Sequence, residues 1–316
     1  MRIAILDAKT LGDDIEYSAL EKEGELVVYP TTKNHEIPER LCGIDCAIFN
    51  KVKLTADILA KCPDLKLICV TATGFDNVDV DYCASHGIAV CNVKGYSTDS
   101  VALVTVSSAL SLITHLFQYD RHVKSGEYTK GGVQNRLVPV YHELKGKTWG
   151  IVGLGDIGKA VAKVAESFGC NVIGFKRTPD ENYTCTDLET LMQKSDIISV
   201  HLPANSETMK IVSREMISLM KDTAILVNAA RGAVIDEEAI TDAVITGKIA
   251  GYATDVYSTE PLPEGHPYEK LYCLDNVILT PHMAWGAYEA RVRLIDEISK
   301  NIESYKNGKS RNRVDL

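Results

Sequence analysis

A fixed spacing of three glycines constrains this 316-residue chain more than any other feature of its sequence. Gly153, Gly155 and Gly158 come directly after the apolar run Thr148 to Val152, and an amphipathic run from Ile157 to Phe168 follows. In such a unit the first glycine allows a tight turn, the second lets the backbone approach a pyrophosphate, and the third lets helix and strand pack closely. The N–H groups at the start of the helix attract phosphate. The pattern predicts a dinucleotide-binding unit; the alternative is a glycine-rich turn in another kind of α/β unit.

The residues after the second strand of this unit bear on which dinucleotide it binds. We expect that strand at Asn171 to Phe175, and an acid near its end normally holds the ribose 2′-hydroxyl of NAD. Here Lys176, Arg177 and Thr178 follow the strand, and the nearest acid, Asp180, lies beyond a proline. Cations suit a 2′-phosphate, which an arginine can bind through two parallel hydrogen bonds. We therefore expect NADP, or use of both NADP and NAD; the alternative is that these cations are ordinary solvated charges.

Length and charge limit the remaining possibilities. A chain of 316 residues fits two domains. Its net charge of −9 gives no basic footprint, so we expect neither a nucleic-acid nor a membrane partner. The sequence MRIAILDAKTLGDD lacks the features of a signal peptide, and no apolar run approaches the roughly 18 residues of a membrane span. The nine cysteines occur singly, and Cys42 and Cys46 lack the spacing of a zinc site. We expect a cytoplasmic protein with reduced thiols and no metal.

Short apolar runs alternate with helical segments along most of the chain, as in parallel sheets that are covered on both faces. The first expected strands are Ile3 to Leu6, Leu26 to Tyr29, Cys46 to Phe49, Leu67 to Val70 and Ala89 to Cys91. The later ones are Thr148 to Val152, Asn171 to Phe175, Ile197 to Leu202, Ala224 to Asn228, Gly251 to Thr254 and Val277 to Leu279. The two sets predict two successive α/β domains.

Three further segments complete the expected organisation. Ser100 to His115 is apolar on almost every side, which predicts a buried helix between the domains. Asp120 to Val140 contains several glycines and is expected to form a loop-rich connection. Ala287 to Asn307 is amphipathic and predicts a last helix.

Polar side chains follow three of the late strands, at the edge where ligands lie in open α/β sheets. Arg231 follows AILVNAA, Asp255 and Glu260 follow GYAT, and His282 follows VILTP. A guanidinium can clamp a carboxylate, an imidazolium can protonate a carbonyl oxygen, and a carboxylate on the far ring nitrogen favours the charged imidazole. The set predicts hydride transfer to a 2-oxo acid, although each residue taken alone could be structural. His201 also ends a strand, and we interpret it as a cofactor-side or packing residue.

These motifs resemble those of the D-isomer-specific 2-hydroxyacid dehydrogenases. The stretches that match are the glycine motif, HLPANSET, NAARGAVIDEEAI, GYATDVYSTEP and LTPHMAW, in this order. The resemblance implies that Arg231, Glu260 and His282 are catalytic, that Asp255 holds the nicotinamide carboxamide, and that Ala229 lies against the nicotinamide ring. The implied cofactor site comprises Gly153, Gly155, Asp156, Ile157, Gly158, Lys176, Arg177, Thr178, His201, Pro203, Thr208, Ala229, Asp255 and Ala284.

The resemblance also implies how the chain is divided. A substrate domain of flavodoxin-like type would comprise residues 1–97 and 286–316, and a Rossmann nucleotide-binding domain, residues 98–285, would be inserted in it. Both would be doubly wound parallel sheets. In TATGFDNVD, the backbone at Thr73 and Gly74 would bind the substrate carboxylate together with Arg231, and His282 would contact the substrate oxygen that is protonated. Lys51 would face the substrate, or is a surface lysine. Family precedent and the apolar helix at Ser100 suggest a homodimer.

Within the family, FNKVKLT, TATGFDNVD, CNVKGYSTDSVA and KGKTWGIVGLGDIG most resemble glycerate dehydrogenases, also called hydroxypyruvate or glyoxylate reductases. This implies reduction of hydroxypyruvate to D-glycerate or of glyoxylate to glycolate. Two alternatives stay open. One is a D-lactate or aromatic D-2-hydroxyacid dehydrogenase, and the other is a dinucleotide-sensing binding protein similar to the C-terminal-binding co-repressors.

Overall fold

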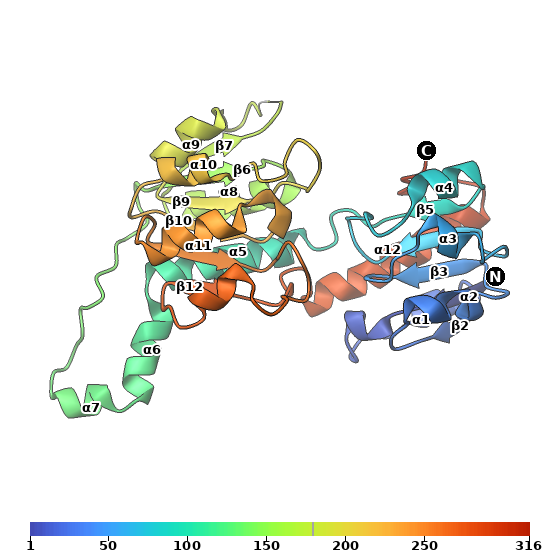
Figure 1. The fold of residues 1–316 in the computed structure, drawn as a ribbon, viewed down its shortest axis with the longest axis horizontal. Coiled ribbons are helices and arrows are strands. Elements are labelled where there is room, and N and C mark those ends of the chain that lie inside the picture. Colours follow the sequence, from blue (N-terminus) through green and yellow to red (C-terminus); the bar gives the residue numbers. More distant parts are fainter. Residues whose placement is uncertain (179) are drawn as a thin grey trace. The chain divides into compact units, whose positions relative to one another are not determined.

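The computed structural model of the protein describes residues 1–178 and 180–316, and it divides into two compact units. Unit 1 comprises Met1–Ser97 with Gly286–Leu316, and unit 2 comprises Thr98–Trp285. Each unit contains its own sheet, and every pair of neighbouring strands runs parallel (Figure 1). The expectation of two doubly wound parallel sheets is confirmed.

Unit 1 has the strand order β2-β1-β3-β4-β5, which is the flavodoxin-like order. Its strands are β1 (Arg2–Ile5), β2 (Glu25–Val28), β3 (Cys46–Phe49), β4 (Leu67–Val70) and β5 (Ala89–Cys91). Its α-helices are α1 (Ser18–Glu21), α2 (Ile37–Arg40), α3 (Ala56–Leu59), α4 (Val80–Ser85) and α12 (Tyr288–Lys306). All residues of β3 and β4 are buried, as the continuous apolar runs predict for central parallel strands.

Unit 2 has the strand order β12-β11-β10-β9-β6-β7-β8, so the chain reverses direction across the sheet between β6 and β9. Its strands are β6 (Thr148–Val152), β7 (Asn171–Phe175), β8 (Thr184–Cys185), β9 (Ile197–Val200), β10 (Ile225–Asn228), β11 (Gly251–Thr254) and β12 (Val277–Leu279). Its α-helices are α5 (Thr98–Ile113), α6 (Leu116–Lys124), α7 (Glu127–Gly131), α8 (Asp156–Ser167), α9 (Leu188–Lys194), α10 (Arg214–Leu219) and α11 (Glu237–Ile245). This is the Rossmann order with one further strand, and ligands bind at such a reversal point.

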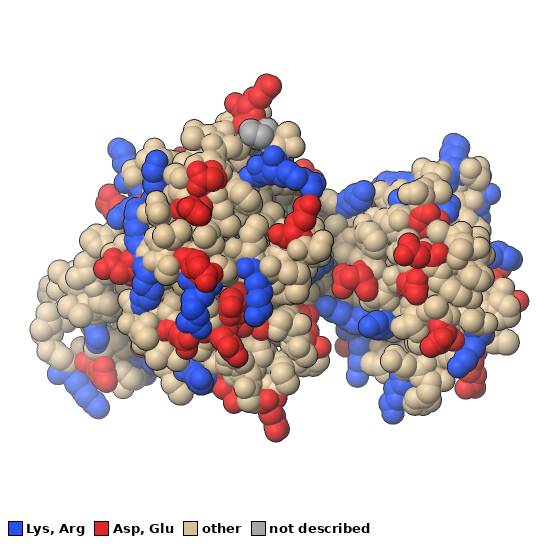
Figure 2. All heavy atoms as spheres, turned by 45° about the horizontal axis from the view of Figure 1, so that its top comes forward, with Lys and Arg blue, Asp and Glu red and all other residues tan. Residues whose placement is uncertain are grey.

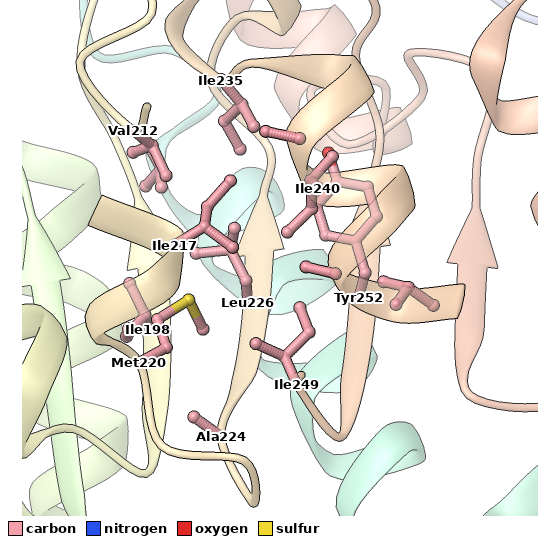
Figure 3. Close-up of a cluster of buried hydrophobic side chains, with 14 of the residues drawn as sticks. Ile198, Val212, Ile217, Met220, Ala224, Leu226, Ile235, Ile240, Ile249 and Tyr252 are labelled. Carbon is pink, nitrogen blue, oxygen red and sulfur yellow. The ribbon is translucent and has the colours of Figure 1, made fainter. Parts of the chain in front are cut away.

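The largest core cluster of unit 2 lies between its sheet and the helices on one face. Leu226 of β10 and Tyr252 of β11 contribute to it from the sheet, and Ile217 of α10 and Ile240 of α11 from the helices (Figure 3). Burial of each such side chain contributes about 1.5–3 kcal/mol relative to exposure. The core therefore fixes β10 and β11, whose carboxyl ends carry two of the predicted site residues.

α5 packs within unit 2, against α8, β10 and β11. The segment that follows α5 differs from its expected form. The stretch Asp120 to Val140, which we predicted as a loop-rich connection, contains the last part of α6 and all of α7. Both helices extend away from the sheet (Figure 1). Gly126 and Gly132 have φ values of 79° and 65° and flank α7, so they act as helix boundaries. The basic last turn of α6 also favours a helix because it complements the helix dipole.

Three further features are the surface charge, the state of the cysteines and the length of the apolar helices. Acidic and basic side chains are interspersed over the face of each unit that Figure 2 shows. All nine cysteines are free thiols, and Cys42 and Cys273 are exposed. Across residues 1–178 and 180–316, no single helix has the length and apolarity to cross a membrane; only α5 and α6 taken together would, and they meet at a bend of 63°.

Candidate active site

The glycine turn has the geometry that its spacing predicts. Gly153 adopts a φ of 105°, which favours glycine, and a Cβ there would lie 2.8 Å from the carbonyl oxygen of His201. A Cβ at Gly158 would lie 2.2 Å from the carbonyl oxygen of Gly153, so α8 packs directly on the turn. At Gly155, by contrast, a Cβ would meet no described atom within 4 Å. The space beside Gly155 is thus open to a ligand, and Asp156 and Ile157 begin the helix that follows it.

Cationic side chains gather at the end of β7. Lys159 Nζ lies 2.6 Å and Lys176 Nζ 3.5 Å from Asp180 Oδ2, while Arg177 contacts Glu207 at 3.2 Å. The hydrogen bond from Lys159 holds the pKa of Asp180 at about 2, well below its usual range. Asp180 is therefore a paired carboxylate at neutral pH. Arg177 is strongly exposed, with 87% of its side chain accessible.

The loop after β9 carries three predicted cofactor residues. The hydroxyl of Thr208 donates to the carbonyl oxygen of Pro203 at 2.5 Å and closes the loop. His201 Nε2 lies 3.0 Å from Ser199 Oγ, which accepts the indole N–H of Trp149. Burial lowers the pKa of His201 to about 3, so its imidazole is neutral at physiological pH. His201 is accordingly unsuited to donate a proton.

The structure brings Glu260 and His282 together. Glu260 Oε2 lies 2.7 Å from His282 Nδ1, and both side chains are about one-quarter exposed. Glu260 Oε1 accepts the backbone N–H of Tyr257 at 3.2 Å. The hydroxyl of Tyr257 donates to the carbonyl oxygen of Thr280, and burial raises the pKa of Tyr257 to about 12, so the phenol stays protonated. The loop that carries Glu260 is thus tied to the segment that carries His282.

Asp255 fixes the turn around His282, a contribution that the sequence did not reveal. Its carboxylate accepts the backbone N–H groups of Met283 and Ala284 at 2.9 and 2.8 Å, and the hydroxyl of Thr280 at 2.6 Å. Asp255 is buried. His282 has a φ of 52°, a conformation that is uncommon outside glycine. These bonds stabilise that strained turn; the predicted contact of Asp255 with a carboxamide stays a prediction.

Arg231 lies at the end of the neighbouring strand, beside the loop that carries Glu260. Asn228 supports this turn, because its side chain accepts the N–H of Ala230 at 3.0 Å and donates to the carbonyl oxygen of Arg231 at 2.9 Å. The next residue, Gly232, packs so tightly that a Cβ would lie 2.0 Å from the carbonyl carbon of Tyr257. Ala229 lies within the same turn. The geometry therefore places the turn that follows Arg231 against the Glu260 loop.

The substrate residues predicted in unit 1 follow β3 and β4, which are neighbours in the sheet. The hydroxyl of Thr73 donates to the carbonyl oxygen of Val93 at 2.8 Å, and Gly74 follows it in the same loop. Lys51 is exposed, and its backbone N–H donates to Asp7 Oδ2 at 2.7 Å. Burial raises the pKa of Asp7. Asp7, at the end of the first strand, thus anchors the Lys51 loop, and sequence reasoning missed it because its partner is distant in sequence.

Within unit 2, the Glu260–His282 pair, Arg231 and the glycine turn lie at one edge of the sheet. The guanidinium of Arg231 donates to the carbonyl oxygen of Ala230 at 2.8 Å. The arrangement can protonate one atom of a substrate and hold an anionic group. Across the described ranges 1–178 and 180–316, no group of three or more His, Cys, Asp or Glu side chains could hold a metal ion.

Comparisons with known proteins agree with this chemistry. Residues 106–284 match the family model described as D-isomer specific 2-hydroxyacid dehydrogenase, NAD binding domain. A glycerate dehydrogenase of Methylorubrum extorquens is 37% identical over 283 residues, which cover 89% of this chain and 88% of the relative. A hydroxypyruvate reductase of Blautia hydrogenotrophica is 34% identical over 317 residues, 98% of each chain.

The likeness extends to solved structures. An acyclic imino acid reductase (Bsp5), solved in complex with NADPH and D-Arg, superposes with a TM-score of 0.88 at 30% identity, covering 99% of this chain and all of that one. A family model that spans more than half of the chain and two relatives that are 37% and 34% identical show the same family. The chain therefore belongs to the family of D-isomer-specific 2-hydroxyacid dehydrogenases, which are oxidoreductases with an NAD-binding domain.

Proposed function

We propose that this protein reduces a small 2-oxo acid with NADPH, and that the substrate is hydroxypyruvate or glyoxylate and the product D-glycerate or glycolate. The observation that carries the proposal is the 2.7 Å contact between Glu260 Oε2 and His282 Nδ1. A carboxylate at this distance fixes the orientation of the imidazole, with Nδ1 toward Glu260 and Nε2 on the opposite side of the ring. The relatives named glycerate dehydrogenase and hydroxypyruvate reductase support the choice of substrate.

In the proposed mechanism each residue has one task. Arg231 holds the substrate carboxylate. Because Nδ1 of His282 faces Glu260, we assign to Nε2 the donation of the proton that the substrate oxygen receives. A bound nicotinamide would supply the hydride to C2 of the substrate. Asp255 keeps His282 in place through the turn at Met283 and Ala284.

For the cofactor, the residues present fit a dinucleotide. The open side of Gly155 would admit the pyrophosphate to the start of α8, where N–H groups and the helix dipole favour anions. Lys176, Arg177 and Thr178 would bind the 2′-phosphate of NADP. To bind it, Arg177 would break its ion pair with Glu207. The loss of stability would be small, because an exposed ion pair contributes at most about 1 kcal/mol.

For the assembly, we propose a homodimer that uses the segment α6, α7 and the residues that follow, which we call the arm (residues 116–141). Nine large apolar side chains of the arm are exposed: Leu116, Phe117, Val123, Tyr128, Val133, Leu137, Val138, Val140 and Tyr141. Monomeric proteins rarely expose so many apolar groups in one segment. A second copy of the chain is the partner that the family resemblance suggests.

For the compartment, we propose the cytoplasm, because nine free thiols suit a reducing environment. The net charge of −9 supports a small-molecule substrate over nucleic acid.

One assay tests the proposal. Purified protein is mixed with NADPH or NADH and a panel of 2-oxo acids: hydroxypyruvate, glyoxylate, pyruvate and phenylpyruvate. Loss of nicotinamide absorbance with hydroxypyruvate or glyoxylate at the highest kcat/KM is the expected result. A preference for pyruvate or phenylpyruvate would instead indicate the D-lactate or aromatic alternative. Tight dinucleotide binding without turnover of any acid would indicate a dinucleotide-sensing binding protein.

A further inference from the structure

We propose that Glu237 is a positioning residue that holds the Glu260 loop in the geometry needed for proton donation. This inference rests on the proposed function, because it concerns how the acid–base pair of that reaction is kept in place. Glu237 is the first residue of α11 and does not belong to the predicted site. It acts through the loop at Ser258, whose backbone N–H donates to the Glu237 carboxylate.

The carboxylate of Glu237 binds the Glu260 loop at two points of one residue. Its Oε1 accepts the backbone N–H of Ser258 at 2.8 Å, and its Oε2 accepts the Ser258 hydroxyl. Ser258 precedes Glu260 by two residues, and the N–H of Tyr257, on the other side of Ser258, donates to Glu260 Oε1. The Glu237 carboxylate thus holds, by hydrogen bonds, the segment that orients the Glu260 side chain. Hydrogen bonds to a charged acceptor are stronger than those between neutral groups, so two of them on one residue can fix a loop.

A second contact anchors Glu237 itself. His266 Nε2 lies 3.2 Å from Glu237 Oε2, and their side chains are only 6% and 11% exposed. His266 Nδ1 accepts the backbone N–H of Tyr268, so the ring proton lies on Nε2 and is donated to Glu237. Tyr268 is fully buried, and its hydroxyl bonds that of Tyr252 in the core of unit 2 at 2.9 Å. The Glu237 carboxylate is therefore held by the core, and the loop is held by the carboxylate.

The space around Ser258 leaves the loop little freedom on its other side. A Cβ on Gly232 would lie 2.2 Å from the backbone nitrogen of Ser258. Ser258 is thus confined between the turn that follows Arg231 and the carboxylate of Glu237. Loss of the carboxylate would release one side of this confinement, and the Glu260 carboxylate would lose its fixed distance to His282.

A general effect of acids at a helix start does not account for these contacts. Negative side chains in the first turn of a helix are favourable through the helix dipole. Glu238, the next residue, lies in the same first turn and is exposed. Glu238→Gln therefore removes the same charge from the same helix end and leaves the loop contacts in place. It is the matched control for Glu237→Gln.

The test is a double-mutant cycle on the full-length enzyme, with hydroxypyruvate and NADPH as substrates. Glu237→Gln and Glu238→Gln are each made in the wild-type and the Glu260→Gln background. We expect Glu237→Gln to lower kcat about 10- to 100-fold, as a small misplacement of a catalytic group does, while the Kd for NADPH changes less than about twofold. Glu238→Gln should leave kcat unchanged. In the Glu260→Gln background, Glu237→Gln should lower kcat by less than about threefold, since residues that act through one another are not additive.

Ser258→Ala is the milder second variant if Glu237→Gln does not fold, because it removes the hydroxyl bond and keeps the N–H bond. It should show a smaller loss of kcat with the same lack of additivity. Equal losses from Glu237→Gln in both backgrounds, or equal losses from Glu237→Gln and Glu238→Gln, would show a merely structural role and overturn the proposal. If wild type is active, Glu260→Gln is impaired and Glu237→Gln has the wild-type rate, this inference alone fails. If wild type reduces no 2-oxo acid, the proposed function fails and this inference fails with it.

Discussion

Asp255 Oδ2 accepts the backbone N–H of Ala284 at 2.8 Å, and this hydrogen bond joins the end of β11 to the turn that carries His282. The turn is strained, with a φ of 52° at His282. A buried carboxylate that accepts several hydrogen bonds can hold such a conformation. The position of the His282 imidazole therefore depends on Asp255, which follows a different strand.

The acid–base pair gives the first prediction. His282→Ala should reduce kcat about 10²- to 10⁴-fold, because general acid catalysis is lost, and should leave the Kd for NADPH nearly unchanged. Glu260→Gln should retain part of the activity. The amide of this variant can still contact Nδ1, but it no longer offers a carboxylate to the imidazole. Steady-state kinetics measure the loss; a wild-type kcat in Glu260→Gln would mean that Glu260 is not the partner of His282 in catalysis.

The guanidinium of Arg231 gives the second prediction. Arg231→Lys keeps the charge but loses the two-point geometry with a carboxylate. It should lower kcat/KM by an amount corresponding to about 2–5 kcal/mol for both hydroxypyruvate and glyoxylate, which present the same carboxylate. Cofactor binding, followed by nicotinamide fluorescence, serves as the control and should be retained. Wild-type rates with both acids would show that the carboxylate is held elsewhere.

Cofactor preference gives the third prediction. Wild type should have a lower KM for NADPH than for NADH. Lys176→Asp should reverse the order, because a carboxylate repels the 2′-phosphate and accepts hydrogen bonds from the free ribose hydroxyls. Arg177→Ala should weaken NADPH binding and leave NADH binding unchanged. Steady-state kinetics with both dinucleotides decide the matter, and a strong wild-type preference for NADH that Arg177→Ala does not alter would refute the assignment.

Two glycines of the turn give the fourth prediction. Gly155→Ala adds a methyl group where no described atom lies within 4 Å, so the melting temperature without cofactor should stay the same while the Kd for the dinucleotide rises. Gly158→Ala places the methyl group 2.2 Å from the carbonyl oxygen of Gly153. Such overpacking should lower the free energy of unfolding by about 1–3 kcal/mol. If Gly155→Ala binds the dinucleotide as tightly as wild type, the pyrophosphate does not approach at this position.

The arm gives the fifth prediction. Wild type should sediment as a dimer, and Phe117→Glu should shift it to monomer, because a charge in an apolar interface is strongly unfavourable. The substitution suits the helix itself, since position 117 lies in the first turn of α6. Tyr272→Glu, at an exposed aromatic residue outside the arm, is the control and should remain dimeric. Sedimentation equilibrium reads the mass; a dimeric Phe117→Glu variant would exclude this part of the arm from the interface.

The sequence determined the features that depend on neighbouring residues. The spacing of Gly153, Gly155 and Gly158 is a local constraint, because one strand, one turn and one helix satisfy it. Alternation of apolar runs likewise predicted two parallel sheets, since a strand buried on both faces must be apolar throughout. The carboxyl ends of parallel strands meet at one edge of a sheet, and this predicted that Arg231, an acid and His282 would lie together; the family resemblance singled out Glu260 as that acid.

Only the tertiary structure decided which acids support that pair. Glu237 and Glu238 are adjacent in sequence and chemically identical, yet only the first binds Ser258, 21 residues later. Asp255 reaches Ala284 across 29 residues. Such contacts depend on how β11, α11 and the loops between them pack, and no local pattern records that packing. The sequence specifies which side chains lie near an edge of the sheet. Whether a carboxylate contacts His282, holds a loop or stays in solvent depends on distances that are set only when the core packs.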